Sequence, residues 1–426
     1  MIVATLDMDI RSPETRPRGT DRVDLYALAE TDLSGYAGLI VSAMADQEHL
    51  ARHRDVIRDY LDAGGVVVFG GHVHRDWLPG AAPFVPLAPP SLRSYRVAEI
   101  AEHPVFDGVE ADDLTFRRGV AGFFARGHHP VPDGAEVLVR LAGGQPATYV
   151  DRVTTAGTIL VQASCDLLGY AGSAGGTAQR IPEQLLDWIR TQSRIQPGPA
   201  TRRTGTAAGL TSLAGCGFAA VYGGSAPHHR ALTTSKYARH LTGGTVYLPD
   251  LAGTDLTGLD GLVIPERMHR GLLEAGARRV LDLLDAGGTV IAFSGGEPLP
   301  AFLPRVRWEH RPTNFWWWLE PGAELGLCIP NPDHPLFRYL GLRDCTWHYH
   351  GVLSPPEGAE VLLELSSGDA LLYVDRVSTP GTLIIATLDP LSHYGSHFMP
   401  ATERFLDGFL PWVSSSENLS QRRLRR

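Results

Sequence analysis

The stretch YVDRVTTAGTILVQASCDLLGY, which begins at Tyr149, returns in closely similar form as YVDRVSTPGTLIIATLDPLSHY, which begins at Tyr373. Two further pairs accompany it: TDLSGYAGLIVS from Thr31 matches TDLTGLDGLVIP from Thr254, and YLDAGGVVVF from Tyr60 matches LLDAGGTVIAF from Leu283. All three pairs are separated by roughly 220 residues, which is the length of a whole domain and far longer than the repeat of a solenoid. The sequence therefore predicts a tandem duplication of one domain.

The length of 426 residues agrees with two domains of about 200 residues each. We place the first copy at 1–195 and the second at 210–415. Between them lies 196–209, which is rich in Pro, Gly and Thr and is predicted to be a linker. The last segment, 416–426, carries the dense basic run QRRLRR and is predicted to be a disordered tail.

Composition narrows the class of protein. Charged residues make up 20% of the chain and the net charge is −9, so a nucleic-acid-binding surface is not expected. The four cysteines lie far apart and form no C-x-x-C pair, which fits free thiols in a reducing compartment. The sequence has no apolar stretch long enough to span a membrane, and the acidic start MIVATLDMDIRSPE does not resemble a signal peptide. We therefore expect a cytoplasmic protein with no membrane partner.

Strand and helix patterns alternate along each copy. In the second copy, strands are predicted at 218–224, in TVYLPDL, at 261–266 and at 289–293, with helices at 228–241 and 272–285. The first copy repeats this path with strands at 38–42 and 66–69 and a helix at 51–62, but its polar, proline-broken segment 11–22 predicts a loop in place of the first helix. Alternation of this kind indicates a parallel sheet covered on both faces.

The last third of each copy predicts short strands joined by turns. HPVF at His103 corresponds to HPLF at His334, and DGAEVLVRL from Asp133 corresponds to EGAEVLLEL from Glu357. The repeated strand pair that opens this section follows, and a closing helix is predicted at 182–190 and at 401–409.

These segments resemble the class I glutamine amidotransferase-like superfamily. The resemblance rests on the helix ending in Gly-Gly, the apolar strand that runs into FGGH or FSGGE, the HPxF segment and the closing YVDRV strand pair. The last two features are similar to its ThuA-like (trehalose-utilisation) branch. The resemblance implies two tandem flavodoxin-like three-layer α/β domains with mainly parallel sheets, and a site at the carboxyl ends of the strands.

The same resemblance implies that the amidotransferase activity is lost. Active members place a nucleophilic cysteine on the elbow after the fourth strand, and here the elbows 70–72 and 294–296 read Gly-Gly-His and Ser-Gly-Gly. A serine needs an adjacent base to replace the thiolate. Ser294 is a weak candidate nucleophile, because Ala292 breaks the G-x-S-x-G pattern of serine hydrolases. A small residue in a tight turn is the simpler interpretation.

The second copy offers the better candidate pocket. After the last strand, the first copy has Asp166 and Tyr170, whereas the second has Asp389, His393 and Tyr394, in the region where the family has its catalytic histidine. The predicted ligand-binding residues are Glu266, Ser294, Gly295, Glu297, His393 and Tyr394. Among them Ser294, Glu297 and His393 are the weak catalytic candidates.

No cofactor is expected, although a divalent metal is possible. His72 and His74 stand two apart after the fourth strand of the first copy, where Asp46 or His49 could complete a metal site. A second H-x-H pair, His348 and His350, falls on a predicted strand of the second copy. Isolated pairs of this kind are more often ordinary hydrogen-bonded or exposed histidines.

Two other features have both structural and functional interpretations. The repeated pairs Asp151 with Arg152 and Asp375 with Arg376 favour a salt bridge that ties the hairpin to the domain body over ligand binding. The run FWWWLEPG, 315–322, could form a platform for a sugar or a protein or could fill the space between the domains. Three consecutive tryptophans cannot all point inward from one strand.

From the sequence we favour a non-catalytic binding or assembly role, with a small-molecule pocket in the second copy. The alternative is a hydrolase acting on a sugar or an amide, with a metal assisting the reaction. The sequence does not name the protein partner or the small-molecule ligand. The two copies are expected to pack against each other as a pseudo-dimer.

Overall fold

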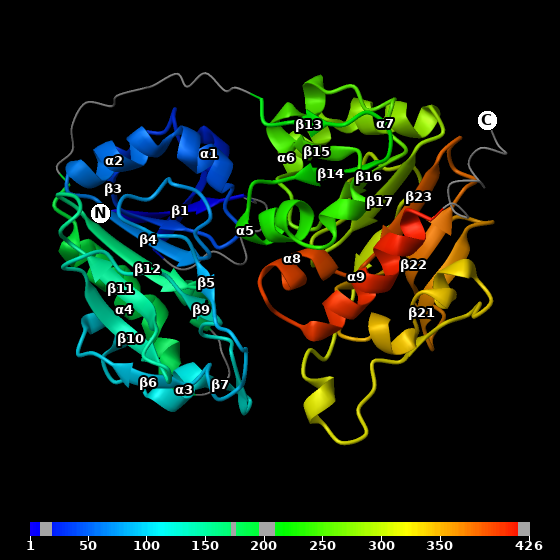
Figure 1. Ribbon diagram of the computed structural model, residues 1–426. Helices are drawn as coiled ribbons and strands as arrows, with labels where there is room; N and C mark the ends of the chain where they lie inside the picture. The colour runs from blue at the N-terminus through cyan, green and yellow to red at the C-terminus, as the bar shows by residue number, and fades with distance from the viewer. Residues whose placement is uncertain (9–18, 172–175, 196–208, 416–426) are drawn as a thin grey trace. The chain divides into compact units, whose positions relative to one another are not determined.

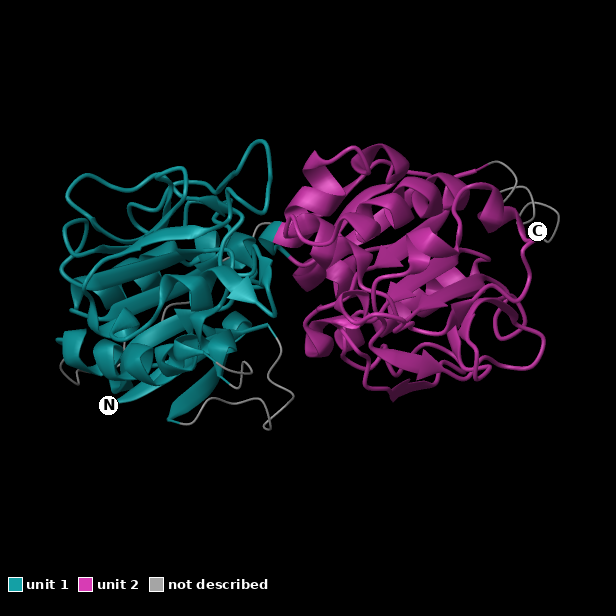
Figure 2. Ribbon diagram, turned by 90° about the horizontal axis from the view of Figure 1, so that it is seen from below, with its two compact units in different colours: residues 1–207, 224–226 teal, residues 208–223, 227–426 magenta. Residues whose placement is uncertain are grey.

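The computed structural model describes residues 1–8, 19–171, 176–195 and 209–415. The chain divides into two compact units, one of residues 1–207 with 224–226 and one of residues 208–223 with 227–426 (Figure 2). The expected tail, 416–426, and all but residue 209 of the expected linker lie outside the described residues, as does most of the polar segment 11–22.

The first unit is built on one mixed sheet of eight strands (Figure 1). In spatial order these are β2 (Thr20–Asp24), β1 (Ile2–Asp7), β3 (Tyr36–Val41), β4 (Val66–Gly71), β12 (Thr158–Ala163), β11 (Pro146–Asp151), β10 (Glu136–Leu141) and β6 (Val97–Ile100). The first five pair in parallel, and the last three join antiparallel. The remaining elements are α1 (Gln47–Arg52), α2 (Arg54–Asp62), α3 (Ala111–Thr115) and α4 (Ile181–Gln192), with two short ribbons, β5 (Val85–Pro86) with β9 (Gly127–His128) and β7 (Phe116–Arg117) with β8 (Val120–Ala121).

The second unit repeats this order in a sheet of eleven strands. Its main path is β13 (Ser212–Leu213), β15 (Gly244–Tyr247), β14 (Phe218–Tyr222), β16 (Gly261–Ile264), β17 (Thr289–Phe293), β23 (Thr382–Ala386), β22 (Ala370–Asp375), β20 (Gly351–Leu353) and β18 (Trp308–His310), with β21 (Glu360–Leu365) and β19 (Leu327–Cys328) branching from β22. The strands from β15 to β23 pair in parallel. The helices are α5 (Ala226–His229), α6 (Arg270–Ala275), α7 (Ala277–Asp285), α8 (Pro390–Gly395) and α9 (Pro400–Val413).

The central strands read as continuous apolar runs because both of their faces are buried. In β17, Val290 and Ala292 pack with residues of α7, whereas Ile291 and Phe293 pack with residues of α9. The strand β4 divides in the same way between the helices α1 and α2 on one face and α4 on the other. Successive side chains of a strand point to opposite faces, so each unit has helices, sheet and helices in three layers. The predicted fold class, two tandem α/β domains with mainly parallel sheets, is confirmed.

The repeated Asp-Arg pairs have a structural role, although Asp and Arg do not pair with each other. Asp375 Oδ1 accepts hydrogen bonds from the main-chain nitrogens of Val377 and Ser378, at 2.8 and 3.0 Å, and Asp151 does the same for the corresponding turn of the first unit. Arg376 bridges to Glu360 on the neighbouring strand at 2.9 Å. In the first unit Arg152 contacts Glu136 at the same distance. The aspartate thus fixes the turn, and the arginine ties β22 to β21.

The repeated HP segments also have a structural role. Nδ1 of His334 accepts from the main-chain nitrogen of Leu336 at 3.3 Å, and the proline that follows occupies the first position of a 3-10 turn. His103 caps the equivalent turn of the first unit in the same way, at 3.3 Å. A side-chain acceptor at this position satisfies one of the unpaired N–H groups of the first turn.

Three predicted helices are broken. The segment 228–241 forms the end of α5, a π-helical stretch Arg230–Thr234 and a 3-10 turn Ala238–His240. The hydroxyls of Thr233, Thr234 and Ser235 donate to main-chain oxygens four residues earlier, which competes with regular helix hydrogen bonding. The predicted helix at 272–285 is divided into α6 and α7 at Gly276, and the one at 51–62 into α1 and α2 at His53.

The aromatic run does not lie on a strand. Trp317 to Leu319 form a 3-10 turn, and Phe315 and Trp318 have exposed fractions of 47% and 50%. Trp317 instead donates from Nε1 to the main-chain oxygen of Trp347 at 2.9 Å. The turn geometry therefore separates the three tryptophans that one strand could not bury together.

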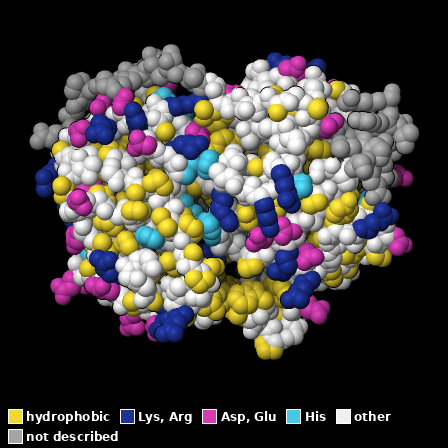
Figure 3. All heavy atoms as spheres, viewed as in Figure 1, with side chains coloured by type: hydrophobic (Ala, Val, Ile, Leu, Met, Phe, Trp, Pro, Cys, Tyr) yellow, Lys and Arg dark blue, Asp and Glu magenta, His cyan; other side chains and the backbone are white. Residues whose placement is uncertain are grey.

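No helix among the described residues is both long and apolar enough to cross a membrane. On the face drawn in Figure 3, basic and acidic side chains are interspersed.

The turn after β22 generates a prediction about stability. Asp375→Ala leaves two main-chain N–H groups without their acceptor, so the free energy of unfolding should fall by about 1–3 kcal/mol. Arg376→Ala removes a bridge to a half-exposed glutamate and should cost about 0–1 kcal/mol. Urea unfolding of both variants measures the difference. Equal losses for the two would contradict the role given to Asp375.

Candidate functional site

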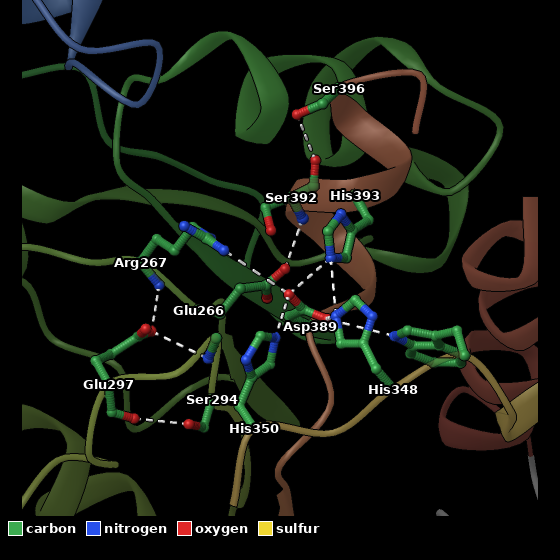
Figure 4. Close-up of polar contacts among 12 residues, drawn as sticks. Glu266, Arg267, Ser294, Glu297, His348, His350, Asp389, Ser392, His393 and Ser396 are labelled. Atoms are coloured by element: carbon green, nitrogen blue, oxygen red, sulfur yellow. Dashed lines mark hydrogen bonds and ion pairs between the residues drawn. The ribbon is translucent and has the colours of Figure 1, made fainter. Parts of the chain in front are cut away.

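The carboxyl ends of β14, β16, β17 and β23 meet at one edge of the second sheet, because these strands are parallel. The strand order turns back at β14, which lies between β15 and β16. Sheets of this kind open a crevice at such a reversal. Four side chains converge at this edge: one ligand atom each from His348, His350, Asp389 and His393, all within 4.8 Å of one another (Figure 4).

The three imidazoles turn the same nitrogen toward one carboxylate. Nε2 of His350 and of His393 each lie 2.9 Å from Asp389 Oδ2, and Nε2 of His348 lies 3.3 Å from Asp389 Oδ1. The Nε2 atoms of His348 and His393 are 3.2 Å apart. Ligand atoms held at about 2.0–2.1 Å around a single zinc ion are themselves separated by about 3.0–3.4 Å. The cluster therefore has the dimensions of a coordination shell.

Sequence and local structure explain how Asp389 reaches this position. It is the N-cap residue of α8, where Pro390 takes the first helical position, yet its carboxylate makes no capping hydrogen bond. Instead, Oε1 of Glu266 accepts from the main-chain nitrogen of Ser392 at 2.5 Å (Figure 4). Glu266 thus satisfies an N–H group that an N-cap aspartate usually satisfies itself. The carboxylate of Asp389 is left to meet the imidazoles.

The histidines come from two places. His393 lies one turn beyond Asp389 on α8, and residues four apart share one face of a helix. His348 and His350 directly precede β20, so the prediction that they lie on a strand is wrong by one residue at its nearer end. The alternate spacing still directs both rings to the same carboxylate.

The first unit provides an internal comparison. Asp166 follows β12 there, and its Oδ1 accepts from the main-chain nitrogen of Leu168 at 2.9 Å, so this aspartate caps its own turn. Ala43 stands where the repeat places Glu266. Burial raises the pKa of Asp166 to about 6, with a further rise from Asp7. Without a substitute cap, the equivalent aspartate remains bound to the main chain.

The protonation states around Asp389 differ from those in the first unit. Burial alone would raise the pKa of Asp389, but the charge of His393 and hydrogen bonds from three imidazoles hold it well below its usual value. Burial lowers the pKa of His348, and this outweighs the effect of Asp389. An ionised carboxylate beside a neutral imidazole is the state in which both groups coordinate a cation.

Glu266 lies beside this cluster and is fully buried. Burial raises its pKa to about 7, the charge of Asp389 adds to the rise, and the hydrogen bond from Ser392 opposes it. A carboxyl group that titrates near neutral pH can accept or donate a proton under ordinary conditions. Glu266 is therefore the titratable group best suited to acid or base chemistry at this edge.

The other predicted residues of the second unit form a separate turn. Ser294 is buried, and its hydroxyl donates to the main-chain oxygen of Glu297 at 2.6 Å. Oε1 of Glu297 accepts from the main-chain nitrogens of Gly295 and Arg267. This turn shows no histidine positioned to activate Ser294. Tyr394 lies apart from the cluster, with its ring under the guanidinium of Arg230 at 4.2 Å.

The candidate metal ligands of the first unit have other partners. Asp46 caps α1 by accepting from the nitrogen of His49 at 2.9 Å, and it accepts from the hydroxyl of Tyr26 at 2.8 Å. Nε2 of His72 lies 3.1 Å from the hydroxyl of Ser164, and the main-chain nitrogen of His74 donates to Gln47. No group of three close metal-ligating side chains among the described residues includes Asp46 or His72.

Sequence reasoning named His393 and the His348–His350 pair separately and did not join them to Asp389. The available signal was DPLSH, in which an aspartate and a histidine four residues apart begin a helix. Two potential ligands at this spacing, together with an H-x-H pair in the same domain, fit one metal site better than either motif alone.

Comparison with known proteins adds evidence about the fold. No family model matches the chain, and no curated protein sequence matches it. Among solved structures, the cytoplasmic protein STM3548 from Salmonella typhimurium is 14% identical, with 45% of this chain and 98% of that chain covered and a TM-score of 0.30. The cytoplasmic protein STM1381 from Salmonella typhimurium LT2 is also 14% identical, with 41% and 82% covered and a TM-score of 0.28. The mmIFT52 N-terminal domain is 14% identical, with 45% and 97% covered and a TM-score of 0.27. These distant similarities indicate no activity.

The raised pKa of Glu266 generates a prediction about pH. The folded state holds this proton more tightly than the unfolded state, where the ordinary value is 4.5, so the resulting stability is complete below about pH 4.5 and is lost as the pH rises through about 7. The loss should amount to about 3 kcal/mol. Glu266→Gln keeps an acceptor for Ser392 and cannot titrate. Urea unfolding of metal-free protein at several pH values should show the wild type losing this stability relative to the variant.

The matched control for this experiment is Glu309→Gln, which removes a carboxylate at an exposed position of β18. Subtracting the variant from the wild type cancels contributions from the neighbouring histidines. A difference between wild type and Glu266→Gln that stays constant from pH 4.5 to 8 would exclude a titration of Glu266 in this range.

Proposed function

We propose that the second unit binds one divalent transition-metal ion through His348, His350, His393 and Asp389. The observation that carries this proposal is the convergence of the four ligand atoms within 4.8 Å. A cluster of hydrogen-bonded histidines is the alternative explanation. It leaves the Nε2 atoms of His348 and His393 facing each other at 3.2 Å while both also face Asp389. If both nitrogens carried the hydrogen that such bonds to Asp389 need, the two hydrogens would repel, whereas an ion accepts a lone pair from each.

The ligand set favours certain metals. Three imidazole nitrogens and one carboxylate suit zinc, and they also suit manganese, iron, cobalt or nickel. Magnesium and calcium prefer sites made of oxygen atoms alone. The buried position of Asp389, with an exposed fraction of 0%, would strengthen the attraction between its charge and a cation.

The reaction class that fits this arrangement is metal-assisted hydrolysis. The side chains of His350 and His393 are 12% and 18% exposed, so a substrate or a water molecule could reach an ion held by them. An ion of this kind lowers the pKa of bound water and polarises a carbonyl or phosphoryl oxygen. Glu266, which titrates near neutral pH, would exchange the proton. The absence of cysteine from the elbow 294–296 agrees with chemistry different from that of amidotransferases.

A binding role without catalysis is the second candidate. It is favoured by the exposed aromatic side chains of Phe315 and Trp318, which offer a surface for a protein or a sugar. Phe315 also packs edge-on against His348, with ring centroids 4.9 Å apart, so this surface adjoins the proposed metal site. Membership of the ThuA-like branch stays a prediction from the sequence.

The metal site generates a prediction about binding. After treatment with a chelator, the protein should bind one zinc ion per chain, as measured by isothermal titration calorimetry. His350→Ala and His393→Ala each remove a ligand that contacts Asp389, so the affinity should fall at least about 100-fold. Zinc at about 100 times its dissociation constant should raise the free energy of unfolding of the wild type by about 2.7 kcal/mol.

The matched control is His310→Ala, which removes an exposed histidine of the same unit outside the cluster. This variant should bind zinc as the wild type does. Equal zinc affinity in the wild type and both ligand variants would assign any binding to surface histidines and refute the proposed site.

A further inference from the structure

Arg267 adopts a backbone conformation that is unusual for its residue type. It follows β16 and has a φ of 61°, in the left-handed region that costs a residue with a side chain about 1 kcal/mol or more. Its main-chain nitrogen donates to Oε1 of Glu297 at 2.6 Å, which holds the turn in place (Figure 4). Such strain persists only where the surroundings enforce it, and it clusters at binding sites.

The result of this turn is that the guanidinium points into the metal cluster. Nη2 of Arg267 lies 3.9 Å from Oδ2 of Asp389, and the side chain is 39% exposed. This distance is too long for a hydrogen bond. Oδ2 of Asp389 already meets His350 and His393 at 2.9 Å. The guanidinium therefore lies at the solvent side of the cluster without closing on its carboxylate.

The nearest other carboxylate is turned away from this guanidinium. Glu297 directs Oε1 to the main-chain nitrogens of Arg267 and Gly295, at 2.6 and 3.2 Å. A divalent ion bound with Asp389 would carry a net single positive charge, and Arg267 adds a second beside it. Neutralisation of Asp389 alone does not require an arginine on a strained turn, because the ion and three imidazoles already serve it.

We infer that Arg267 binds the oxyanion group of a small-molecule ligand, a carboxylate or a phosphate, which also reaches the metal ion. This inference rests on the proposed metal site and defines the class of ligand that the site accepts. The planar guanidinium offers paired N–H donors that match two oxygens of such a group, and these charge-assisted bonds are stronger than neutral ones. The ion and the guanidinium would hold the same anion from two sides.

The test uses the full-length chain loaded with cobalt(II), whose visible absorption reports changes in coordination. Inorganic phosphate and acetate are titrated separately, so that the two kinds of oxyanion are distinguished. At least one of them should change the spectrum of the wild type in a saturable way. Arg267→Ala should bind cobalt(II) but need at least about 10-fold more anion for the same change, since a hydrogen bond to a charged group contributes about 1.5–3 kcal/mol.

Two further variants keep the test sharp. Arg267→Gly removes the side chain and suits the left-handed backbone, so it reports on the guanidinium even if the alanine variant folds poorly. Arg270→Ala is the matched control, because Arg270 lies three residues later and pairs with Glu274 at 2.7 Å away from the cluster. It should respond to anions as the wild type does.

The outcomes separate the two proposals. If cobalt(II) binds and neither anion changes the spectrum of the wild type, or if Arg267→Gly responds at the same concentration as the wild type, the inference about Arg267 is overturned while the metal site stands. If cobalt(II) does not bind to the wild type, the metal site and this inference fall together.

Discussion

The hydrogen bond from the nitrogen of Ser392 to Glu266 is the interaction on which the candidate site depends. An aspartate at the start of a helix ordinarily accepts from the first-turn N–H groups. By taking one of those groups, Glu266 frees Asp389 to face three imidazoles. The cluster is thus a consequence of how one helix is capped, and a buried glutamate from a different strand end supplies the cap.

The two units show which features of the duplicated domain concern folding and which concern chemistry. Both keep the strand order, the aspartate that fixes the last hairpin and the histidine that caps a 3-10 turn. The metal-ligating cluster occurs in the second unit, whereas in the first the aspartate after the last parallel strand caps its own turn. Similarity between the copies therefore marks the scaffold, and the difference between them marks the site.

Much of the fold could be predicted because the repeat and the apolar strands are local patterns with one physical interpretation. The broken helices could not, since the competition between the hydroxyls of 233–235 and the helix depends on small differences in free energy. The site was predicted in part. Glu266 and His393 were named, but Asp389 looks like an ordinary N-cap in the sequence, and its release is visible only once Glu266 is placed beside Ser392.

The alanine at position 43 and the glutamate at 266 occupy matching places in the repeat. The sheet is built in the same order around both, so the fold tolerates either residue. In evolutionary terms, a single codon at this position can decide whether the neighbouring aspartate serves the backbone or becomes available for new chemistry. Gene duplication supplies the spare copy in which such a change escapes selection against loss of the original arrangement.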